Sequence, residues 1–363
     1  MSSPPKAGDP SAAKPSKPVG VAAAGATAEA TAGPLDSVVI EVQTADYDDD
    51  DEFETEEWDE GSSNASTSIT SSIYAHTYEN GRRFHKYKYG RYPVPNDDRE
   101  QNREDMKHAM MMELTDGKLF FSPIGDHPNK ILDLGTGTGI WAIEVGDQYP
   151  SAEVLGVDLS PIQPPWTPPN VKFIIDDFEE DEWLNGSGWD LVHLRSMSAS
   201  IRDAAKLCRA TFEHLRPGGW MEWQEQHPWF QCDDGTMPAE GDPAAEFYTL
   251  AQSAFAKLGF DGHLAPKLGQ SLEQAGFRNV QCVVKKVPVG PWARDKTLRL
   301  VGMYLKTIIQ EFVPVCTARP FQVLGLSETE REAWRATAIR ALEDQSVHRY
   351  WNVYFWYGQK PPA

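Results

Sequence analysis

Short apolar runs alternate with longer helix-like segments from Lys130 to the end of the chain. Apolar runs bounded by glycine or polar residues are typical of buried strands, whereas helices need longer segments. This alternation predicts an α/β fold, with a mostly parallel sheet and helices on both of its faces. The expected strands are 131–134, 153–157, 171–175, 191–194, 220–224, 280–289 and 350–357, and the expected helices are 141–149, 201–215, 266–275, 295–312 and 327–343.

The amino-terminal part of the chain has a different composition. Residues 1–34 are rich in Pro, Ala, Gly and Ser, and residues 46–60 hold eleven acidic side chains. Such segments bury too little apolar surface to offset the entropy of ordering, so we expect residues 1–65 to form a disordered acidic tail. The tail either keeps the protein in solution or docks on a basic protein partner. The apolar residues within 38–42 are a candidate recognition element.

A third type of sequence lies between the tail and the α/β region. Aromatic and basic residues are frequent from Ser66 to Tyr92, and a segment rich in acidic and basic residues follows at 98–114. The second segment is typical of a helix. We therefore expect residues 66–125 to form an N-terminal helical extension that packs on the α/β domain.

Charge and cysteine content exclude several classes of protein. The net charge is −20, and residues 1–81 alone hold three lysines against sixteen acidic residues. No basic face is evident, so we expect no direct contact with nucleic acid. Cys208, Cys232, Cys282 and Cys316 have no metal-like spacing, and the chain does not open with a signal peptide, which favours the cytoplasm or nucleus over secretion. The absence of a long apolar run predicts no membrane span.

The first expected strand runs into a glycine-rich loop. Gly135, Gly137 and Gly139 follow Ile131–Leu134 and precede a helix. Glycines there permit a tight turn and let a ligand approach bare backbone at the helix amino terminus. In the dinucleotide fingerprint the third glycine falls five residues after the first, whereas here it falls four residues after it. The spacing therefore disfavours an NAD-dependent oxidoreductase.

Acidic residues close the next two expected strands. Asp158 lies 23 residues after Gly135, where a carboxylate can accept both hydroxyl groups of a ribose. Asp158 is also compatible with a simple cap on the following segment. Asp176, Asp177 and Phe178 end the third strand, where a carboxylate can meet an adenine amino group and a backbone amide can meet a ring nitrogen. The three strand ends together predict a nucleoside-containing cofactor.

The combined pattern resembles class I S-adenosylmethionine-dependent methyltransferases. It comprises D-x-G-x-G-x-G over Asp133–Gly139, the acids that close the second and third strands, and Arg216–Gly219 before the fifth strand. Over about residues 70–362 the chain more closely resembles the fungal LaeA-like methyltransferase family. The segments that carry this closer resemblance are Glu79–Arg83, Pro95–Asp97, Ile140–Trp141, Asp158–Pro164, Pro169–Val171, Pro217–Trp220, Asp233–Thr236 and Gln359–Pro361.

The resemblance implies a Rossmann-like fold with a seven-stranded, mostly parallel sheet, and S-adenosyl-L-methionine bound across the strand carboxyl ends. It implies a methyltransferase domain at 126–362, lid-like insertions near 226–262 and 291–345, and an extension that covers the active site. No metal is implied. The residues that it assigns to the cofactor are Gly135, Thr136, Gly137 and Gly139 in the loop, Asp158 and Leu159 at the ribose, and Asp177 and Phe178 at the adenine.

His193 is the candidate catalytic residue. It interrupts the apolar strand 191–194 near its carboxyl end, where the transferred methyl group is expected. A hydroxyl acceptor benefits from a general base, whereas a carboxylate acceptor needs none. His193 is also compatible with a cofactor contact or a satisfied core histidine, and Arg195 with an anion site or a structural ion pair. Three polar residues at the next expected strand and after it are individually more typical of structural roles: Glu222, Glu225 and His227.

The expected function is methyl transfer to a carboxyl or hydroxyl oxygen of a small natural product in fungal secondary metabolism. No Asn-Pro-Pro-Tyr-like tetrapeptide lies at 190–193, which disfavours a nucleobase amino group as the acceptor. The alternative is a nuclear regulatory methyltransferase, or a noncatalytic partner of transcriptional regulators that control metabolism and development.

Overall fold

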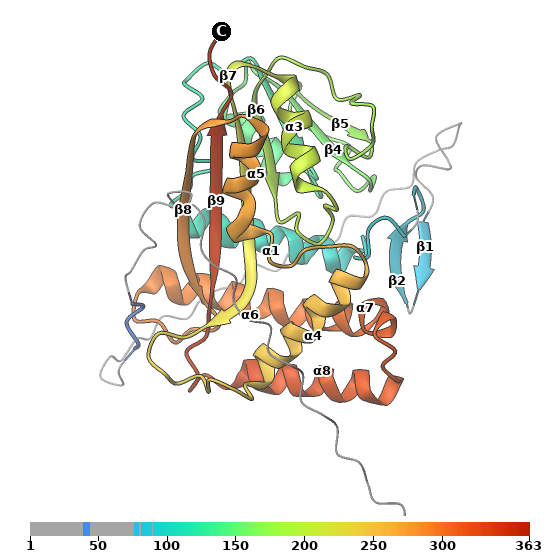
Figure 1. The fold of residues 1–363 in the computed structure, drawn as a ribbon, viewed down its shortest axis with the longest axis vertical. Helices are drawn as coiled ribbons and strands as arrows, with labels where there is room; N and C mark the ends of the chain where they lie inside the picture. Colours follow the sequence, from blue (N-terminus) through green and yellow to red (C-terminus); the bar gives the residue numbers. More distant parts are fainter. Residues whose placement is uncertain (1–38, 44–75, 80, 89) are drawn as a thin grey trace, which may run out of the picture. The chain divides into compact units, whose positions relative to one another are not determined.

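A seven-stranded sheet forms the centre of the fold in the computed structural model, which describes residues 39–43, 76–79, 81–88 and 90–363 (Figure 1). Its strands are β3 (Lys130–Leu134), β4 (Glu153–Asp158), β5 (Val171–Ile175), β6 (Trp189–Arg195), β7 (Leu215–Gln231), β8 (Arg278–Pro288) and β9 (Tyr350–Gln359). The strand order is β5-β4-β3-β6-β7-β9-β8. The first five strands in this order, from β5 across to β7, are parallel. Strand β9 runs antiparallel to both β7 and β8. The predicted mostly parallel sheet is confirmed.

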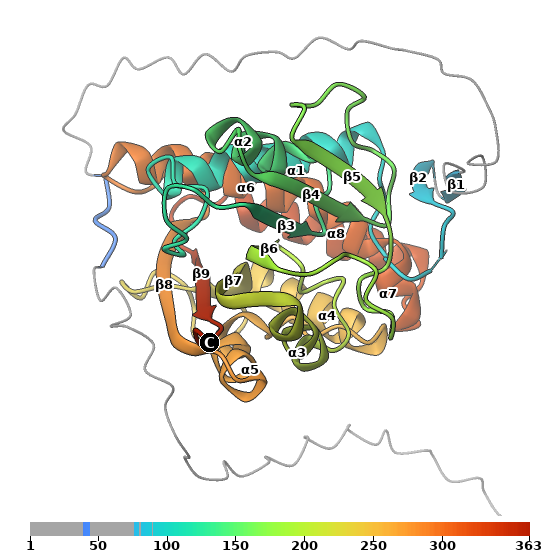
Figure 2. The ribbon, with the colours of Figure 1, turned by 90° about the horizontal axis from the view of Figure 1, so that it is seen from above.

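Helices cover both faces of the sheet (Figure 2). Helix α2 (Ile140–Gln148) packs on one face through Trp141 and Val145, in the same cluster as Ile131. Helices α3 (Ala204–His214) and α5 (Leu268–Ala275) pack on the other face, in the cluster that contains Leu132 and Leu134. Successive residues of β3 therefore face opposite helix layers, as the two-residue period of a strand requires.

A further group of helices lies at the carboxyl ends of the parallel strands (Figure 1). Met110, Phe247, Val301, Phe321 and Leu342 form part of its shared apolar core. No helix in the described part of the chain is long and apolar enough to cross a membrane. The helices of this group are α1 (Asp98–Leu114), α4 (Pro243–Lys257), α6 (Lys296–Thr317), α7 (Arg319–Val323) and α8 (Glu328–Glu343).

The N-terminal extension is helical only in part. Helix α1 begins after Asp97, whose carboxylate accepts a hydrogen bond from Glu100 N at 3.1 Å. The prediction of helix is wrong for the preceding segment, where β1 (His76–Glu79) and β2 (Arg82–His85) form an antiparallel hairpin. The Asn-Gly pair at 80–81 is the sequence signal for such a turn, and Gly81 has φ +76°.

Residues 39–43 pack on the domain, although they were expected to belong to a disordered tail. Ile40 is buried against Trp292, Ala293 and Tyr350. Two backbone hydrogen bonds hold the segment, from Gln43 N to Trp292 O at 3.0 Å and from Arg294 N to the carbonyl of residue 41 at 2.7 Å. The prediction of a disordered tail is wrong for these five residues, because the side chain of Ile40 packs into an apolar cluster of the domain. The remainder of the predicted tail lies outside the described residues.

Candidate functional site

The glycine loop connects β3 to α2 in a conformation that favours glycine at three positions. Gly135, Gly137 and Gly139 have φ values of +76°, +58° and +84°. A Cβ on Gly135 would overlap the Met197 sulfur, and a Cβ on Gly139 would overlap the Phe173 ring. A Cβ on Gly137 would meet no atom within 4 Å, so this part of the loop faces open space. The loop therefore combines close packing beneath it with room for a ligand at Gly137.

Asp158 closes β4 beneath the same loop. Its Oδ2 accepts a hydrogen bond from Gly137 N at 2.8 Å, and its Oδ1 accepts one from Ser160 N at 2.8 Å. Burial raises the pKa of Asp158 to about 6, although both hydrogen bonds favour the carboxylate. Each carboxylate oxygen keeps a further lone pair. Asp158 thus caps the following segment and still has the acceptor capacity that two ribose hydroxyls need.

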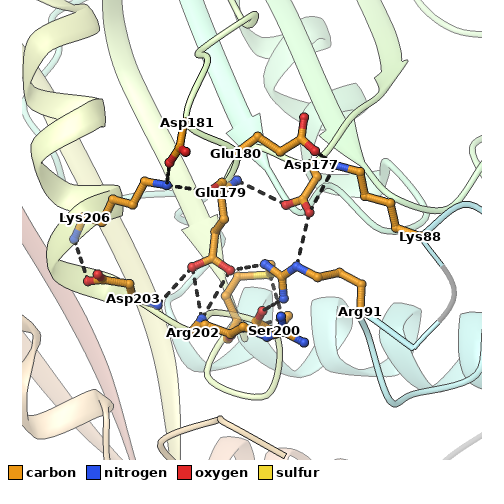
Figure 3. A network of polar contacts seen from close by, with 11 residues as sticks. Lys88, Arg91, Asp177, Glu179, Glu180, Asp181, Ser200, Arg202, Asp203 and Lys206 are labelled. Carbon is orange, nitrogen blue, oxygen red and sulfur yellow. Dashed lines mark hydrogen bonds and ion pairs between the residues drawn. The ribbon is translucent and has the colours of Figure 1, made fainter.

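Asp177 lies after β5 in a network of charged side chains (Figure 3). Arg91 Nε lies 3.2 Å from Asp177 Oδ2, and Lys88 Nζ lies 3.5 Å from the same atom. Arg91 also donates to Ser200 O at 2.9 Å and pairs with Glu179. Ion pairs therefore connect Asp177, which was predicted to hold the adenine, to the N-terminal extension. No sequence pattern indicated this connection.

The extension contacts two other parts of the site. Thr138 Oγ1, in the glycine loop, donates to Asp105 Oδ1 of α1 at 2.7 Å. Arg195 Nη2, at the end of β6, donates to His108 Nδ1 of α1 at 3.0 Å. Burial and Arg195 together lower the pKa of His108 to about 3, so His108 is neutral at neutral pH. These contacts favour the structural alternative for Arg195.

The structure places His193 in the core, which corrects the expectation that it faces the methyl group. Its side chain is fully buried, and its ring stacks on Trp141 with 3.6 Å between centroids and 5° between planes. Nδ1 lies 2.8 Å from Asp133 Oδ1, and Nε2 has no hydrogen-bond partner among the described residues. The sequence correctly placed His193 near the carboxyl end of β6. The face of the sheet to which its side chain points depends on the register between β6 and β3, which the sequence did not reveal.

A cavity lies between the carboxyl end of β6, the part of β7 that contains Glu225 and Gln226, and helices α1, α4 and α6. It has about 860 Å³ of space between atoms, part of which is open to solvent. A concave site with a mostly apolar lining and a few polar side chains suits a small organic molecule. Its aromatic and aliphatic lining includes Tyr92, Val94, Tyr248, Phe255, Phe260, Ile308, Ile309, Phe312 and Trp351, and its polar lining includes Arg103, Glu104, Lys107, Ser196, Ser198, Glu225 and Gln226.

Three charged residues of α1 line one side of the cavity. Arg103 Nη2 lies 2.5 Å from Glu104 Oε1, and Lys107 Nζ lies 2.7 Å from Glu104 Oε2. Burial raises the pKa of Glu104, but Lys107 and Arg103 outweigh it and hold that pKa below its ordinary value. Both cations of the cavity wall are thus already paired with a carboxylate.

Two acidic residues of β7 have different surroundings. Glu222 is fully buried, and its Oε2 accepts from Phe121 N at 2.8 Å and from Ser122 N at 2.7 Å, which is a structural role. Glu225 is also buried, but it lines the cavity. Its Oε2 accepts from Met197 N at 2.7 Å, and burial raises its pKa to about 7. A sequence signal was present, because an ionisable residue follows a predicted strand at its carboxyl end.

Comparison with known proteins gives one family. A methyltransferase domain model matches residues 103–282. The methyltransferase pytC of Aspergillus terreus is 38% identical over 297 residues, which cover 81% of this chain and 91% of that protein. The secondary metabolism regulator laeA of Aspergillus fumigatus is 34% identical over 307 residues, 83% of this chain and 81% of that protein. The protein-methionine methyltransferase laeA of Emericella nidulans is 33% identical over 289 residues, with coverage of 78% and 76%.

The sheet order, the glycine loop and the matching domain model define a class I S-adenosylmethionine-dependent methyltransferase. Its cofactor is S-adenosyl-L-methionine. The chain belongs to the LaeA-like family of these enzymes, which is related to proteins of fungal secondary metabolism. The predicted family, fold and cofactor are confirmed, whereas the roles of individual residues remain predictions.

Proposed function

We propose that this enzyme methylates a hydroxyl or carboxyl oxygen of a small natural product bound in the cavity. The observation that carries this proposal is the position of the cavity at the carboxyl end of β6, next to Glu225 and Gln226 of β7. Ser196, Ser198 and Ala199 line the cavity, and Met197 of the same loop packs on Gly135. The acceptor cavity and the glycine loop are therefore neighbours, as methyl transfer requires.

The chain's own residues hold the cofactor and exclude water. S-adenosyl-L-methionine supplies an electrophilic methyl group when bound. Apolar side chains of α4 and α6 shield the acceptor from water and orient it. The proposed cofactor contacts are Gly135, Thr136, Gly137 and Gly139 in the loop, Asp158 with Leu159 at the ribose, and Asp177 with Phe178 at the adenine.

Incubation with an extract tests the proposed function. An organic extract of a strain that lacks the gene contains the unmethylated acceptor, and purified protein with tritiated S-adenosylmethionine should label it. Asp158→Ala, which removes the acceptor oxygens under the glycine loop, should abolish labelling at a cofactor concentration near the wild-type Kd. An unlabelled extract, with cofactor binding intact, would contradict the proposal.

A second candidate function has a specific observation in its favour. The Met197 thioether packs on the glycine loop, and one relative is named a protein-methionine methyltransferase. We propose methylation of a methionine sulfur, either Met197 or a methionine of a protein partner, as the alternative. Incubation with cofactor alone, followed by mass spectrometry, should then give a methylated peptide that contains residue 197, and Met197→Leu should remove it. If the peptide that contains residue 197 is unmodified, Met197 is not the acceptor, and only a methionine of a protein partner is left in this alternative.

The proposed location is the cytoplasm or nucleus. All four cysteines are free thiols, which is usual in reducing compartments.

A further inference from the structure

We propose that Glu225 is a catalytic base, and that the methyl acceptor is a neutral compound with a hydroxyl group on an apolar framework, not a carboxylic acid. This inference rests on the proposed function of the cavity and narrows its substrate class. Glu225 would then take the role that the sequence suggested for His193.

The two oxygens of Glu225 have different surroundings. Oε2 accepts from Met197 N at 2.7 Å, Ser198 N at 2.9 Å and Trp223 Nε1 at 3.2 Å. No residue in the described part of the chain donates a hydrogen bond to Oε1. The side chain is 2% exposed and lines the cavity. One oxygen thus fixes the carboxylate in place, and the other is left for a ligand.

One loop connects Glu225 to the cofactor loop. Met197 donates its backbone N–H to Glu225, and its side chain packs on Gly135. A ligand in the cavity that reaches this loop is therefore near both the carboxylate and the glycine loop. His193 lacks this arrangement, since it is buried against Trp141 and does not line the cavity.

The charges around the cavity disfavour an anionic acceptor. On α1, both Arg103 and Lys107 are paired with Glu104, so neither is an open site for a carboxylate. Glu225 on β7 adds a further negative charge, and Lys107, which lowers the pKa of Glu225, is already paired with Glu104. Burial raises the pKa of Tyr248 on α4 well above its ordinary value, and it raises that of Cys316 on α6 as well, so both are neutral.

Tyr92, from the extension, also lines the cavity, and burial raises its pKa in the same way. The groups that face Glu225 thus add no unpaired cation. A neutral hydroxyl can enter without the cost of placing two negative charges side by side.

The proposed step balances in atoms and charge. The acceptor hydroxyl gives its proton to Glu225 Oε1 as its oxygen forms a bond to the methyl carbon. The methyl–sulfur bond breaks with its electron pair remaining on sulfur, which becomes a neutral thioether. Glu225 then releases the proton to water. A carboxylate acceptor would have no proton to give and would need no base.

A binding experiment tests the charge argument without turnover. The probes are 2-naphthol and 2-naphthoic acid, which share a ring system and differ in the acceptor group. At pH 8 we expect wild-type protein to bind 2-naphthol at least about tenfold more tightly, and Glu225→Gln should reduce this preference about tenfold, because one negative charge is removed. Glu222→Gln is the matched control, since Glu222 lies on the same strand and does not line the cavity. A preference for the acid, no binding of 2-naphthol, or an unchanged preference in Glu225→Gln would overturn the inference.

An activity experiment tests the base. Tritiated methyl groups transferred to the gene-deletion extract should be stable to mild alkali, as in a methyl ether, whereas a methyl ester would release volatile methanol. Glu225→Gln should lower the rate by about 100-fold with unchanged cofactor affinity. At saturating cofactor, the wild-type rate should rise with pH through the Glu225 pKa of about 7, because the base acts only when deprotonated. Alkali stability and the wild-type pH profile need no variant, so they remain decisive if Glu225→Gln fails to fold.

The outcomes separate two failures. If wild-type protein binds the cofactor but labels nothing in the extract, the proposed function fails and this inference fails with it. If labelling occurs but is alkali-labile, or if it persists at the full rate in folded Glu225→Gln, the inference alone is overturned.

Discussion

Arg91 and Asp177 are separated by 86 positions in the sequence, yet Arg91 Nε lies 3.2 Å from Asp177 Oδ2 (Figure 3). This ion pair joins the N-terminal extension to the strand end at which we expect the adenine. Arg91 also donates to Ser200 O, in the segment that follows β6. One side chain of the extension thus connects two loops of the site.

Replacement of Arg91 with Ala should weaken the site. Asp177 and Glu179 would lose their shared cation, and Ser200 O would lose a donor. We expect the free energy of unfolding to fall by about 1–3 kcal/mol and cofactor affinity to fall several-fold. Chemical denaturation and calorimetric titration measure the two effects.

Arg335→Ala is the control for the Arg91 variant. Arg335 pairs with Glu332 on the exposed surface of α8, with relative side-chain exposures of 44% and 65%, so its loss should have little effect. Equal effects of the two variants would show that the extension does not support the cofactor site.

The sequence predicted local structure better than long-range contacts. Strand and helix positions followed from apolar patterning, because side chains of one element bury against a common core. Strand β7 proved longer than the predicted 220–224, since polar residues beyond that range are buried with partners from distant segments, such as Glu225, whose Oε2 accepts from Met197 N at 2.7 Å. A local pattern cannot distinguish such residues from a loop.

In the candidate site, too, local features were predictable and long-range contacts were not. The glycine loop and Asp158 were predictable because they lie within one strand-loop-helix unit and the strand beside it. The cavity role of Glu225 and the core position of His193 depend on side-chain direction and on packing of α1, α4 and α6, which only the assembled fold determines.

Asp158 should give the protein a measurable pH dependence. Burial raises its folded pKa to about 6 from its ordinary value of 3.8, so the native state binds the proton more tightly. The stability that this group contributes is fully present below pH 3.8 and is lost as the pH rises through 6. Cofactor affinity should change in the opposite sense, because the ribose hydroxyls need the carboxylate.

Asp158→Asn is the test of this titration. Its unfolding free energy should change less between pH 4 and pH 7 than that of wild type, by about 1–3 kcal/mol, and its cofactor affinity should be weaker and independent of pH. Glu225 has a raised pKa as well, so the difference between the two proteins, not the wild-type curve, isolates Asp158. Identical curves would show that Asp158 does not titrate in this range.

Ile40 should contribute to stability, although it lies in the segment that the sequence predicted to be a disordered tail. Ile40→Ala removes apolar surface that is buried against Trp292 and Tyr350, so we expect a loss of about 1–3 kcal/mol in unfolding free energy. Val39 is 56% exposed, and Val39→Ala should have almost no effect. Equal melting temperatures for wild type and both variants would show that residues 39–43 do not hold the domain.

His193 should affect stability far more than catalysis. Its ring fills the space between Trp141 and Asp133, so His193→Ala leaves a cavity and an unpaired buried carboxylate. We expect a loss of about 2–5 kcal/mol in unfolding free energy. His193→Gln keeps a donor for Asp133 and should lose less. For both variants, turnover per folded molecule at saturating cofactor should stay within a few-fold of wild type, because no atom of His193 lines the cavity. A fall of about 100-fold in turnover for a fully stable His193→Gln would instead identify His193 as the base, and would require the core to open during the reaction.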